Sequence, residues 1–329
     1  MRVVALGGGT GLSTLLRGLR HHVAAPGQSD AASALISDLA AVVTVTDDGG
    51  SSGRLREDFN MLPPGDLRNC MVALSEEEDL LSRLFSHRFR SGRSLKGHTL
   101  GNLFVAALTE ITGDFALAIQ LSSKILATRG RIYPATTANT TLVAQMDDGS
   151  LVRGETNITA SRRRIVELSL DPPNPAPLPE TLEAIERADL ITVGPGSLYT
   201  SLITNLLVGG IATAIKEAKG LRVYVCNLMT QANESLGLSA ADHIERIYAH
   251  TGAPVFDYAL VNTAPFSAET LARYAAEGAS PIAADIERIE ALGVHVIAGD
   301  FASEEAVVRH DATRVTEALM SLSPRSRQS

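Results

Sequence analysis

Short apolar runs alternate with longer amphipathic segments through most of this chain, and that alternation restricts its fold more than any other feature. The apolar runs have the length of buried strands and cover residues 2–6, 40–46, 190–193, 222–226, 258–261 and 295–297. Apolar residues at helical spacing predict helices at 12–23, 66–74, 100–111, 115–126, 180–188, 197–219, 240–251, 267–277 and 311–322. Strands that alternate with helices favour an α/β fold with a Rossmann-like, doubly wound and mostly parallel sheet.

One segment departs from this alternation. Residues 140–156 form two runs around Asp148-Gly149, a pair that is typical of a β-hairpin turn. We therefore expect a hairpin insertion at about 131–170 within a single domain that spans residues 1–322. The last residues, 323–329, are predicted to be a disordered tail.

Composition excludes several classes of function. With 4% aromatic residues, no tryptophan and a formal net charge of −8, the chain is a poor candidate for binding nucleic acid. Cys70 and Cys226 are too few for a disulfide framework or a cysteine-based zinc site, and no metal site is predicted. No apolar run has the length of a membrane span, and the sequence opens without a signal-peptide pattern. We therefore expect a cytoplasmic protein.

Two glycine-rich turns each connect an apolar run to the start of a predicted helix. The first is GGGTGLS at 7–13, where the backbone can approach a phosphate through Gly8, Gly9, Thr10 and Gly11. Its spacing does not match the G-x-G-x-x-G pattern of dinucleotide-binding turns. The second turn is VGPGSLYTSLI at 193–203, with candidate residues Gly194, Pro195, Gly196, Ser197 and Thr200. Both turns predict one shared crevice, although a tight turn or an ordinary helix cap would also explain each of them alone.

In the stretch VTVTDDGGSSGRLREDF at 43–59, two adjacent acidic residues follow the end of a predicted strand. Rossmann-type folds place an acid there on ribose hydroxyls, which requires only one of Asp47 and Asp48. The small residues that follow can form an anion-binding backbone concavity, and they are Gly49, Gly50, Ser51, Ser52 and Gly53. Arg54 comes next and is predicted to bind a phosphate bidentately. The alternative is a solvated turn with salt bridges.

A histidine lies just before the best predicted helix. GHTLGN at 97–102 places His98 before the helix N-terminus, where a neutral imidazole is favoured, and Asn102 in the first turn. His98 could therefore act as an acid or base, and a capping or packed histidine is an equal alternative.

Two other segments contribute polar candidates. PPGDLRNC at 63–70 offers Arg68 and Asn69, and Asp66 is expected to be the N-cap of the helix there. Asn227 ends another apolar run and is a candidate for recognising a base or sugar.

These motifs together resemble the gluconeogenesis-factor proteins of the YvcK type, relatives of the 2-phospho-lactate transferase CofD. The matching segments run in order along nearly the whole chain, at 7–13, 46–56, 63–70, 97–103, 194–201, 227–231, 242–243 and 309–311. The resemblance implies a CofD-like, Rossmann-related fold and binding of a nucleotide sugar of the UDP-N-acetylglucosamine kind. It also implies a cytoplasmic protein that cells need for normal shape when they grow on gluconeogenic carbon.

Two positions depart from the family pattern. Thr204 stands where the family has a proline, and Ala232-Asn233-Glu234-Ser235 replaces the family's Pro-Gly-Glu-Thr. The second change removes a glycine from a loop near the expected crevice, so it bears on loop conformation and ligand preference.

Three functions fit these residues. The first is a nucleotide-sugar-binding regulatory protein in which the glycine turns hold the diphosphate, Arg54 supplies charge, Asn227 binds base or ribose, and Arg309 is a weaker clamp. The second is a CofD-like transferase that moves a phosphorylated acid from a nucleoside diphosphate to an alcohol, with His98 and Asp48 as catalytic residues and Mg²⁺ at the acid pair. The third is a nicotinamide oxidoreductase, which the glycine spacing disfavours, although NAD(P) could still bind so polar a crevice.

The expected partners follow from the first interpretation. They are a nucleotide sugar or dinucleotide, a regulatory protein of the cell envelope, and a second copy of the chain in a homodimer. No motif in the sequence identifies a surface for either protein partner.

Overall fold

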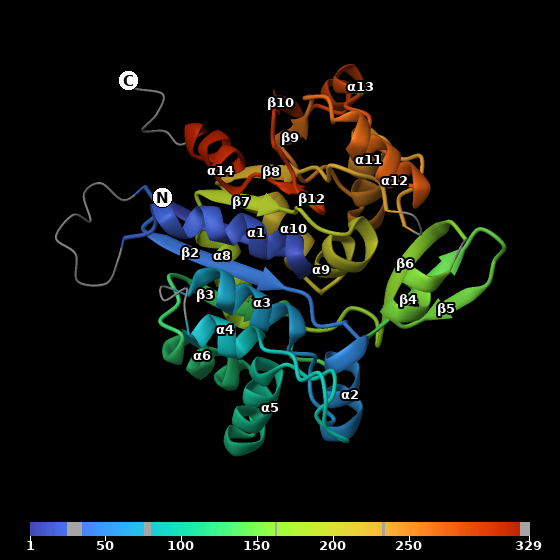
Figure 1. Ribbon diagram of the computed structural model, residues 1–329. Helices are drawn as coiled ribbons and strands as arrows, with labels where there is room; N and C mark the ends of the chain where they lie inside the picture. The colour runs from blue at the N-terminus through green and yellow to red at the C-terminus, as the bar shows by residue number, and fades with distance from the viewer. Residues whose placement is uncertain (25–34, 76–79, 162, 232–233, 323–329) are drawn as a thin grey trace.

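The structure, a computed structural model, describes residues 1–24, 35–75, 80–161, 163–231 and 234–322, so the tail expected at 323–329 lies outside the described residues. Seven strands of the described chain form one sheet in the order β10-β9-β8-β7-β1-β2-β3, and each neighbouring pair is parallel. The strands are β1 (Arg2–Gly7), β2 (Asp38–Val43), β3 (Arg131–Pro134), β7 (Leu190–Val193), β8 (Leu221–Val225), β9 (Tyr258–Asn262) and β10 (His295–Gly299). The predicted α/β class is confirmed (Figure 1).

Helices cover both faces of the sheet, because alternate side chains of each strand point to opposite sides. Val3 and Ala5 of β1 pack with one apolar cluster, and Val4 and Leu6 pack with the other. The first face carries α1 (Gly9–Leu19), α3 (Gly65–Leu74), α6 (Phe115–Ile125) and α14 (Ala312–Ser321). The second face carries α8 (Pro179–Arg187), α10 (Ile211–Glu217) and α11 (Ala240–Thr251).

The remaining helices lie around this core. They are α2 (Gly50–Phe59), α4 (Leu80–Ser86), α5 (Leu100–Thr112), α7 (Glu155–Ala160), α9 (Thr204–Leu206), α12 (Ala268–Ala276), α13 (Ile286–Ala291), a 3₁₀ turn (Arg20–His22) and a π-helical turn (Leu198–Ile203). The helix predicted at 197–219 is therefore broken before α10, where Gly210 has a φ of +79°.

Within the described ranges, no single helix is long and apolar enough to cross a membrane. The segments Leu198–Leu206 and Ile211–Glu217 meet the length and composition test only as a pair, with a bend of 75° between them. The apolar side chains of both segments belong largely to the core.

A small antiparallel sheet, in the green segment of Figure 1, is separate from the main sheet, and its apolar side chains pack into the second of the two clusters. It contains β4 (Thr141–Met146), β5 (Leu151–Arg153) and β6 (Ile165–Asp171), in the order β5-β4-β6. The predicted Asp148-Gly149 turn joins β4 to β5, with Gly149 at a φ of +82°. Because β3 pairs with β2 in the main sheet, the added sheet begins at Thr141 and not near residue 131.

Candidate functional site

A cleft of about 480 Å³ lies beyond the carboxyl ends of β1, β2, β7 and β8, where open α/β sheets bind ligands. Ten of the residues predicted from the sequence line it, and they are Gly8, Gly9, Thr10, Gly11, Asp47, Pro195, Gly196, Ser197, Asn227 and Arg309. The predicted convergence of both glycine turns on one crevice is therefore present in the structure.

The two glycine turns touch each other at the floor of the cleft. A Cβ atom added to Gly11 would lie 2.5 Å from the carbonyl oxygen of Pro195, so only glycine fits there without displacement of the backbone. A Cβ at Gly8 would meet three oxygen atoms within 3.2 Å, from Asp66, Thr44 and Ser201. Glycine at these positions thus serves close approach of backbone segments.

Asn227 holds the second turn in place. Its Oδ1 accepts a hydrogen bond from the backbone N–H of Gly196 at 3.1 Å, and its Nδ2 donates to the carbonyl oxygen of Gly196 at 2.7 Å. The N–H of Gly194 donates to the carbonyl of Leu6. These two N–H groups already donate within the protein, so they are not available to a phosphate. The second turn therefore contributes mainly to the shape of the cleft.

The N-terminus of α1 opens into the cleft. Its N-cap is Gly8, which has no side chain to cap the helix, and Thr10 and Gly11 occupy the first turn. The first N–H groups of a helix have no acceptor within the helix, and they favour a bound anion. The N–H of Gly9 donates to the carboxylate of Asp66, so in the first glycine turn the candidates for phosphate binding are the N–H groups of Thr10 and Gly11.

Asp66 is not the N-cap predicted from the sequence. The N-cap of α3 is Pro64, and Asp66 lies in the first turn with its carboxylate turned toward α1. That carboxylate is hydrogen-bonded by the N–H of Gly9 and the hydroxyl of Thr44. Burial, and then the nearby Asp47, raise the pKa of Asp66 to about 6.

A third acid reaches the cleft from α7, beside the added sheet. Glu155 lines the cleft with Asp47 and Asp66, and Thr46 donates to its Oε2 at 3.5 Å. Burial, followed by the charge of Asp47, raises the pKa of Glu155 to about 9, so this carboxyl is protonated at neutral pH. One side of the cleft thus carries three carboxyl groups, and that of Glu155 is neutral.

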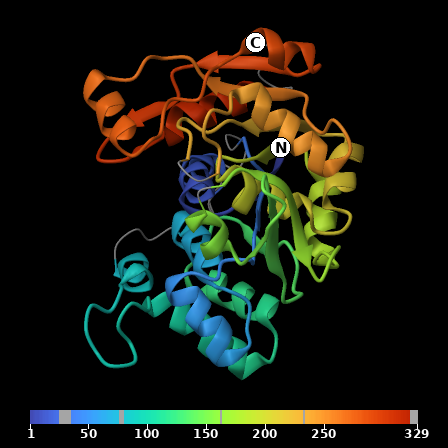
Figure 2. The ribbon, with the colours of Figure 1, turned by 90° about the vertical axis from the view of Figure 1, so that its right-hand side faces the viewer.

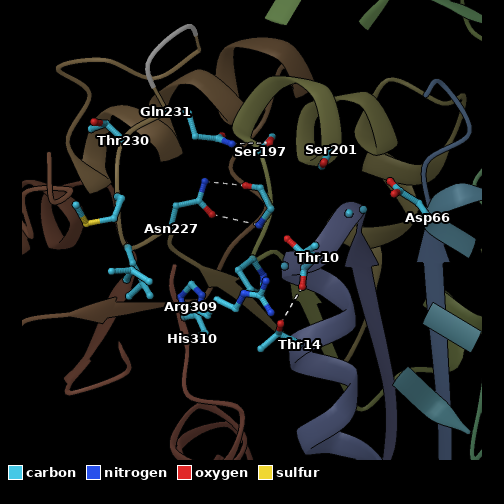
Figure 3. A pocket seen from close by; sticks show the side chains of 18 of the residues that line it. Thr10, Thr14, Asp66, Ser197, Ser201, Asn227, Thr230, Gln231, Arg309 and His310 are labelled. Carbon is cyan, nitrogen blue, oxygen red and sulfur yellow. Dashed lines mark hydrogen bonds between the residues drawn. The ribbon is translucent and has the colours of Figure 1, made fainter. Parts of the chain in front are cut away.

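The other side of the cleft is formed by a hairpin of β11 (Ala302–Glu304) and β12 (Val308–His310). His310 donates from Nε2 to the carbonyl of Cys226 at 3.0 Å, and burial lowers its pKa to about 4. Arg309 is exposed, and among the described lining residues it carries the one guanidinium. In Figure 3 Asp66 and Arg309 lie on opposite sides of Thr10.

The structure places the other predicted residues outside the cleft lining, and they are Asp48, Gly49, Gly50, Ser51, Ser52, Gly53, Arg54, Arg68, Asn69, His98, Asn102, Gly194 and Thr200. Asp48 accepts from the N–H and the hydroxyl of Thr156 through its Oδ1, at 2.8 and 2.6 Å, so it anchors α7. The hydroxyl of Thr200 donates to buried Glu234 at 3.0 Å. Of the departures from the family pattern, Ala232 and Asn233 lie outside the described residues.

Arg54 does not reach the cleft as predicted. Its Nη2 donates to the carbonyl of Lys96 at 2.8 Å, and its Nε to the carbonyl of Gly50 at 3.4 Å. The guanidinium therefore joins α2 to the loop before α5, and among the described residues that line the cleft the guanidinium is that of Arg309.

His98 belongs to a buried polar chain and not to the cleft lining. Its Nδ1 lies 3.0 Å from Oγ of Ser51, which also accepts from Nδ2 of Asn102 at 3.0 Å. Arg68 continues the chain by donating to Oδ1 of Asn102. Burial, and then the charge of Arg54, lower the pKa of His98, so the neutral form expected from the sequence is favoured.

Sequence reasoning missed several lining residues, chiefly Thr14, Asp66, Glu155, Thr230, Gln231 and His310. Asp66 was available in PPGDLRNC, but its position after Pro-Pro-Gly favoured a capping role. Glu155 lies beyond the hairpin and had no local signal.

Within the described residues, no group of three or more His, Cys, Asp or Glu side chains is placed to hold a metal ion. A Mg²⁺ ion of the kind considered from the sequence would be held by one or two carboxylates together with the phosphates of a ligand.

Comparison with known proteins relates the whole chain to one family. The family described as 2-phospho-L-lactate transferase CofD matches residues 3–302. A protein of Halalkalibacterium halodurans named gluconeogenesis factor is 47% identical over 328 residues, covering 99% of this chain and 98% of that protein. A Bacillus subtilis protein of the same name is 45% identical over 322 residues, covering 98% of each. A crystal structure of a UPF0052 family member from Bacillus halodurans superimposes with a TM-score of 0.90 at 47% identity, covering 97% of this chain and 98% of that one.

Proposed function

This chain belongs to the CofD family, with relatives named gluconeogenesis factors, and from that premise we propose that it is a cytoplasmic regulatory protein that binds a nucleotide sugar in the cleft. UDP-N-acetylglucosamine represents the ligand class. The physiological role proposed is support of normal cell shape during growth on gluconeogenic carbon.

The observation that carries this proposal is the distribution of charge along the cleft. The N-terminus of α1 lies between Arg309 on one side and Asp66, which accepts from the N–H of Gly9, on the other, and Asp47 also lines the cleft. A diphosphate needs the donors and the cation, whereas sugar hydroxyls need acceptors. A nucleotide sugar carries both groups in one molecule and so fits both parts of the cleft.

The proposal therefore assigns an orientation to the ligand. Its phosphates lie over Thr10 and Gly11 and pair with Arg309. Its sugar hydroxyls donate to Asp47, and the neutral carboxyl of Glu155 can both donate and accept. Asn227 has a positioning role, because its amide is already bonded to the backbone of Gly196.

A thermal-shift titration tests the proposal. A ligand that binds only the folded state stabilises it by about 2.7 kcal/mol at a hundredfold excess over Kd, which corresponds to about 5 °C for a chain of this length. We expect UDP-N-acetylglucosamine to give this shift and NAD(P) to give a smaller one at the same concentration. A UDP-sugar that produces no shift at millimolar concentration would contradict the proposal.

Asp66 favours one alternative, a CofD-like transferase. A carboxylate with a pKa near 6 is suited to general-base catalysis at neutral pH. In that reaction the oxygen of an acceptor alcohol forms a new bond to the phosphorus that carries the acid, and the bond from that phosphorus to a nucleoside monophosphate breaks. The hydroxyl proton passes to Asp66.

Nucleotide release separates the two functions. The protein is mixed with a nucleoside-diphosphate donor and candidate alcohols, and nucleoside monophosphate is measured over time. The regulatory proposal expects no release above the protein-free rate. Release that disappears in Asp66→Asn, while nucleotide binding persists, would establish the transferase in its place.

A further inference from the structure

A long segment of this acidic chain contains no acidic residue. Between residues 80 and 109 there is no Asp or Glu, although the chain as a whole has a formal net charge of −8. The cations are concentrated in residues 87–97, which we name the basic loop, and they are Arg88, Arg90, Arg93 and Lys96. All four are exposed.

The basic loop has a defined backbone. The N–H of Phe89 donates to the carbonyl of His98 at 2.9 Å, and the N–H of Gly97 donates to the carbonyl of Phe89 at 2.8 Å. These bonds join the two arms of the loop as in a hairpin. Figure 2 shows the loop projecting from the body after α4, in cyan. The base of the loop is therefore held by backbone hydrogen bonds.

The charges of the basic loop are not neutralised by the described part of the protein. No ion pair in that part involves Arg88, Arg90, Arg93 or Lys96. Arg88 donates to the carbonyl of Gly97. Leu95 is 44% exposed between these cations. Arginine is enriched at protein–protein interfaces, so a group of exposed, unneutralised arginines favours a protein-binding surface.

The loop is attached to the helix that follows the acid pair. Arg54 of α2 donates to the carbonyl of Lys96, and His98, next to the loop, contacts Ser51 of α2. The loop is thus connected to the segment that leads from Asp47 of the cleft.

We propose that the basic loop is the docking surface for an acidic peptide segment of a partner protein. Carboxylates of that segment pair with Arg88, Arg90 and Arg93, and its apolar side chains contact Leu95. This surface is separate from the nucleotide-sugar cleft and adds a second binding activity.

A carboxylate-rich peptide fits better than the other anionic partners. Three of the four cations are arginines, whose planar guanidinium matches a carboxylate bidentately. An extended anionic membrane would also meet Asp58, which is exposed on α2 and acts on the charge of His98 next to the loop. Two copies of the chain cannot pair this surface with itself, because like charges would meet.

Fluorescence anisotropy with a labelled peptide of about ten glutamates tests the proposal at 50 and 150 mM salt. The test variant is R88E/R90E/R93E. The control is K124E/K216E/K219E, which makes the same charge change at exposed lysines elsewhere. We expect peptide affinity to fall at least about thirtyfold in the test variant and to change less than about threefold in the control. R88K/R90K/R93K should lose roughly three- to tenfold, because lysine lacks the bidentate fork.

Three results would overturn the proposal. One is equal loss of affinity in the test and control variants, which indicates a general effect of net charge. Another is binding to phosphatidylglycerol vesicles without binding to the peptide. The third is self-association in sedimentation that only the test variant abolishes. Retention of the UDP-sugar thermal shift in the test variant shows that it is folded, so failure here is distinguishable from failure of the cleft.

Discussion

The side-chain amide of Asn227 forms two hydrogen bonds with the backbone of one residue, Gly196, accepting at 3.1 Å and donating at 2.7 Å. These two hydrogen bonds hold the residue that follows β8 against the turn after β7. Because the turn also touches Gly11, the amide sets the width of the cleft floor.

We therefore expect Asn227→Ala to weaken UDP-sugar binding at least about tenfold and to destabilise the fold by about 1–3 kcal/mol, since two part-buried backbone groups lose their partners. Gln231→Ala is the matched control: it also lines the cleft, but its side-chain amide donates to the hydroxyl of Ser197 and not to the backbone of the turn. Urea denaturation and calorimetric titration measure both effects. If Asn227→Ala matches the control in stability, Asn227 does not fix the turn.

Gly11→Ala should force the two turns apart, because the new methyl group would lie 2.5 Å from the carbonyl oxygen of Pro195. We expect a loss of about 1–3 kcal/mol in stability, together with loss of ligand binding. Gly113→Ala is the control, since it has a φ of +68° but open space around it. It should cost about 1 kcal/mol through backbone strain alone and leave affinity unchanged. Normal ligand affinity in Gly11→Ala would contradict the close contact.

Glu155 should make the unliganded protein less stable as the pH rises. Its pKa in the folded protein, about 9, is above that of the unfolded chain, so its contribution is full at low pH and is lost as the pH rises through about 9. Glu155→Gln should remove this loss. The free energy of unfolding of the variant relative to wild type should increase between pH 6 and 9, by at most about 1.4 kcal/mol per pH unit. Parallel pH profiles for the two proteins would show that Glu155 is already ionised.

His98 is expected to hold structure and not to bind ligand. His98→Ala leaves Ser51 without one partner, so stability should fall by about 1–3 kcal/mol while UDP-sugar affinity stays within about threefold. Denaturation and titration on the same preparation check this. A variant with normal stability that no longer binds the ligand would place His98 in the binding site after all.

The fold could be predicted from the sequence because its signals are local. The strands at 190–193 and 258–261 are apolar runs, and Asp148-Gly149 marks its own turn. The break before α10 was not predicted, since apolar residues continue through it and the interruption depends on Gly210 in tertiary context.

The site could be predicted only where the backbone itself forms it. Gly11 and Gly196 line the cleft because the turns after parallel strands converge. Arg54 and Asp66 show what the sequence does not determine, namely the direction of a side chain on a helix. Arg54 points to the loop before α5, and Asp66 points across to α1, because of how α2 and α3 pack.

The central claim is that a nucleotide sugar binds in the cleft with its phosphates on Arg309. Calorimetric titration of UDP-N-acetylglucosamine into wild type, Arg309→Ala and Arg54→Ala tests it most directly. Arg309→Ala should lose about 1.5–3 kcal/mol of binding free energy, the worth of a charge-assisted hydrogen bond. Arg54→Ala should bind the ligand within about threefold of wild type, because the guanidinium of Arg54 donates to the backbone carbonyl of Lys96. The reverse pattern, in which Arg54→Ala abolishes binding and Arg309→Ala does not, would contradict the account.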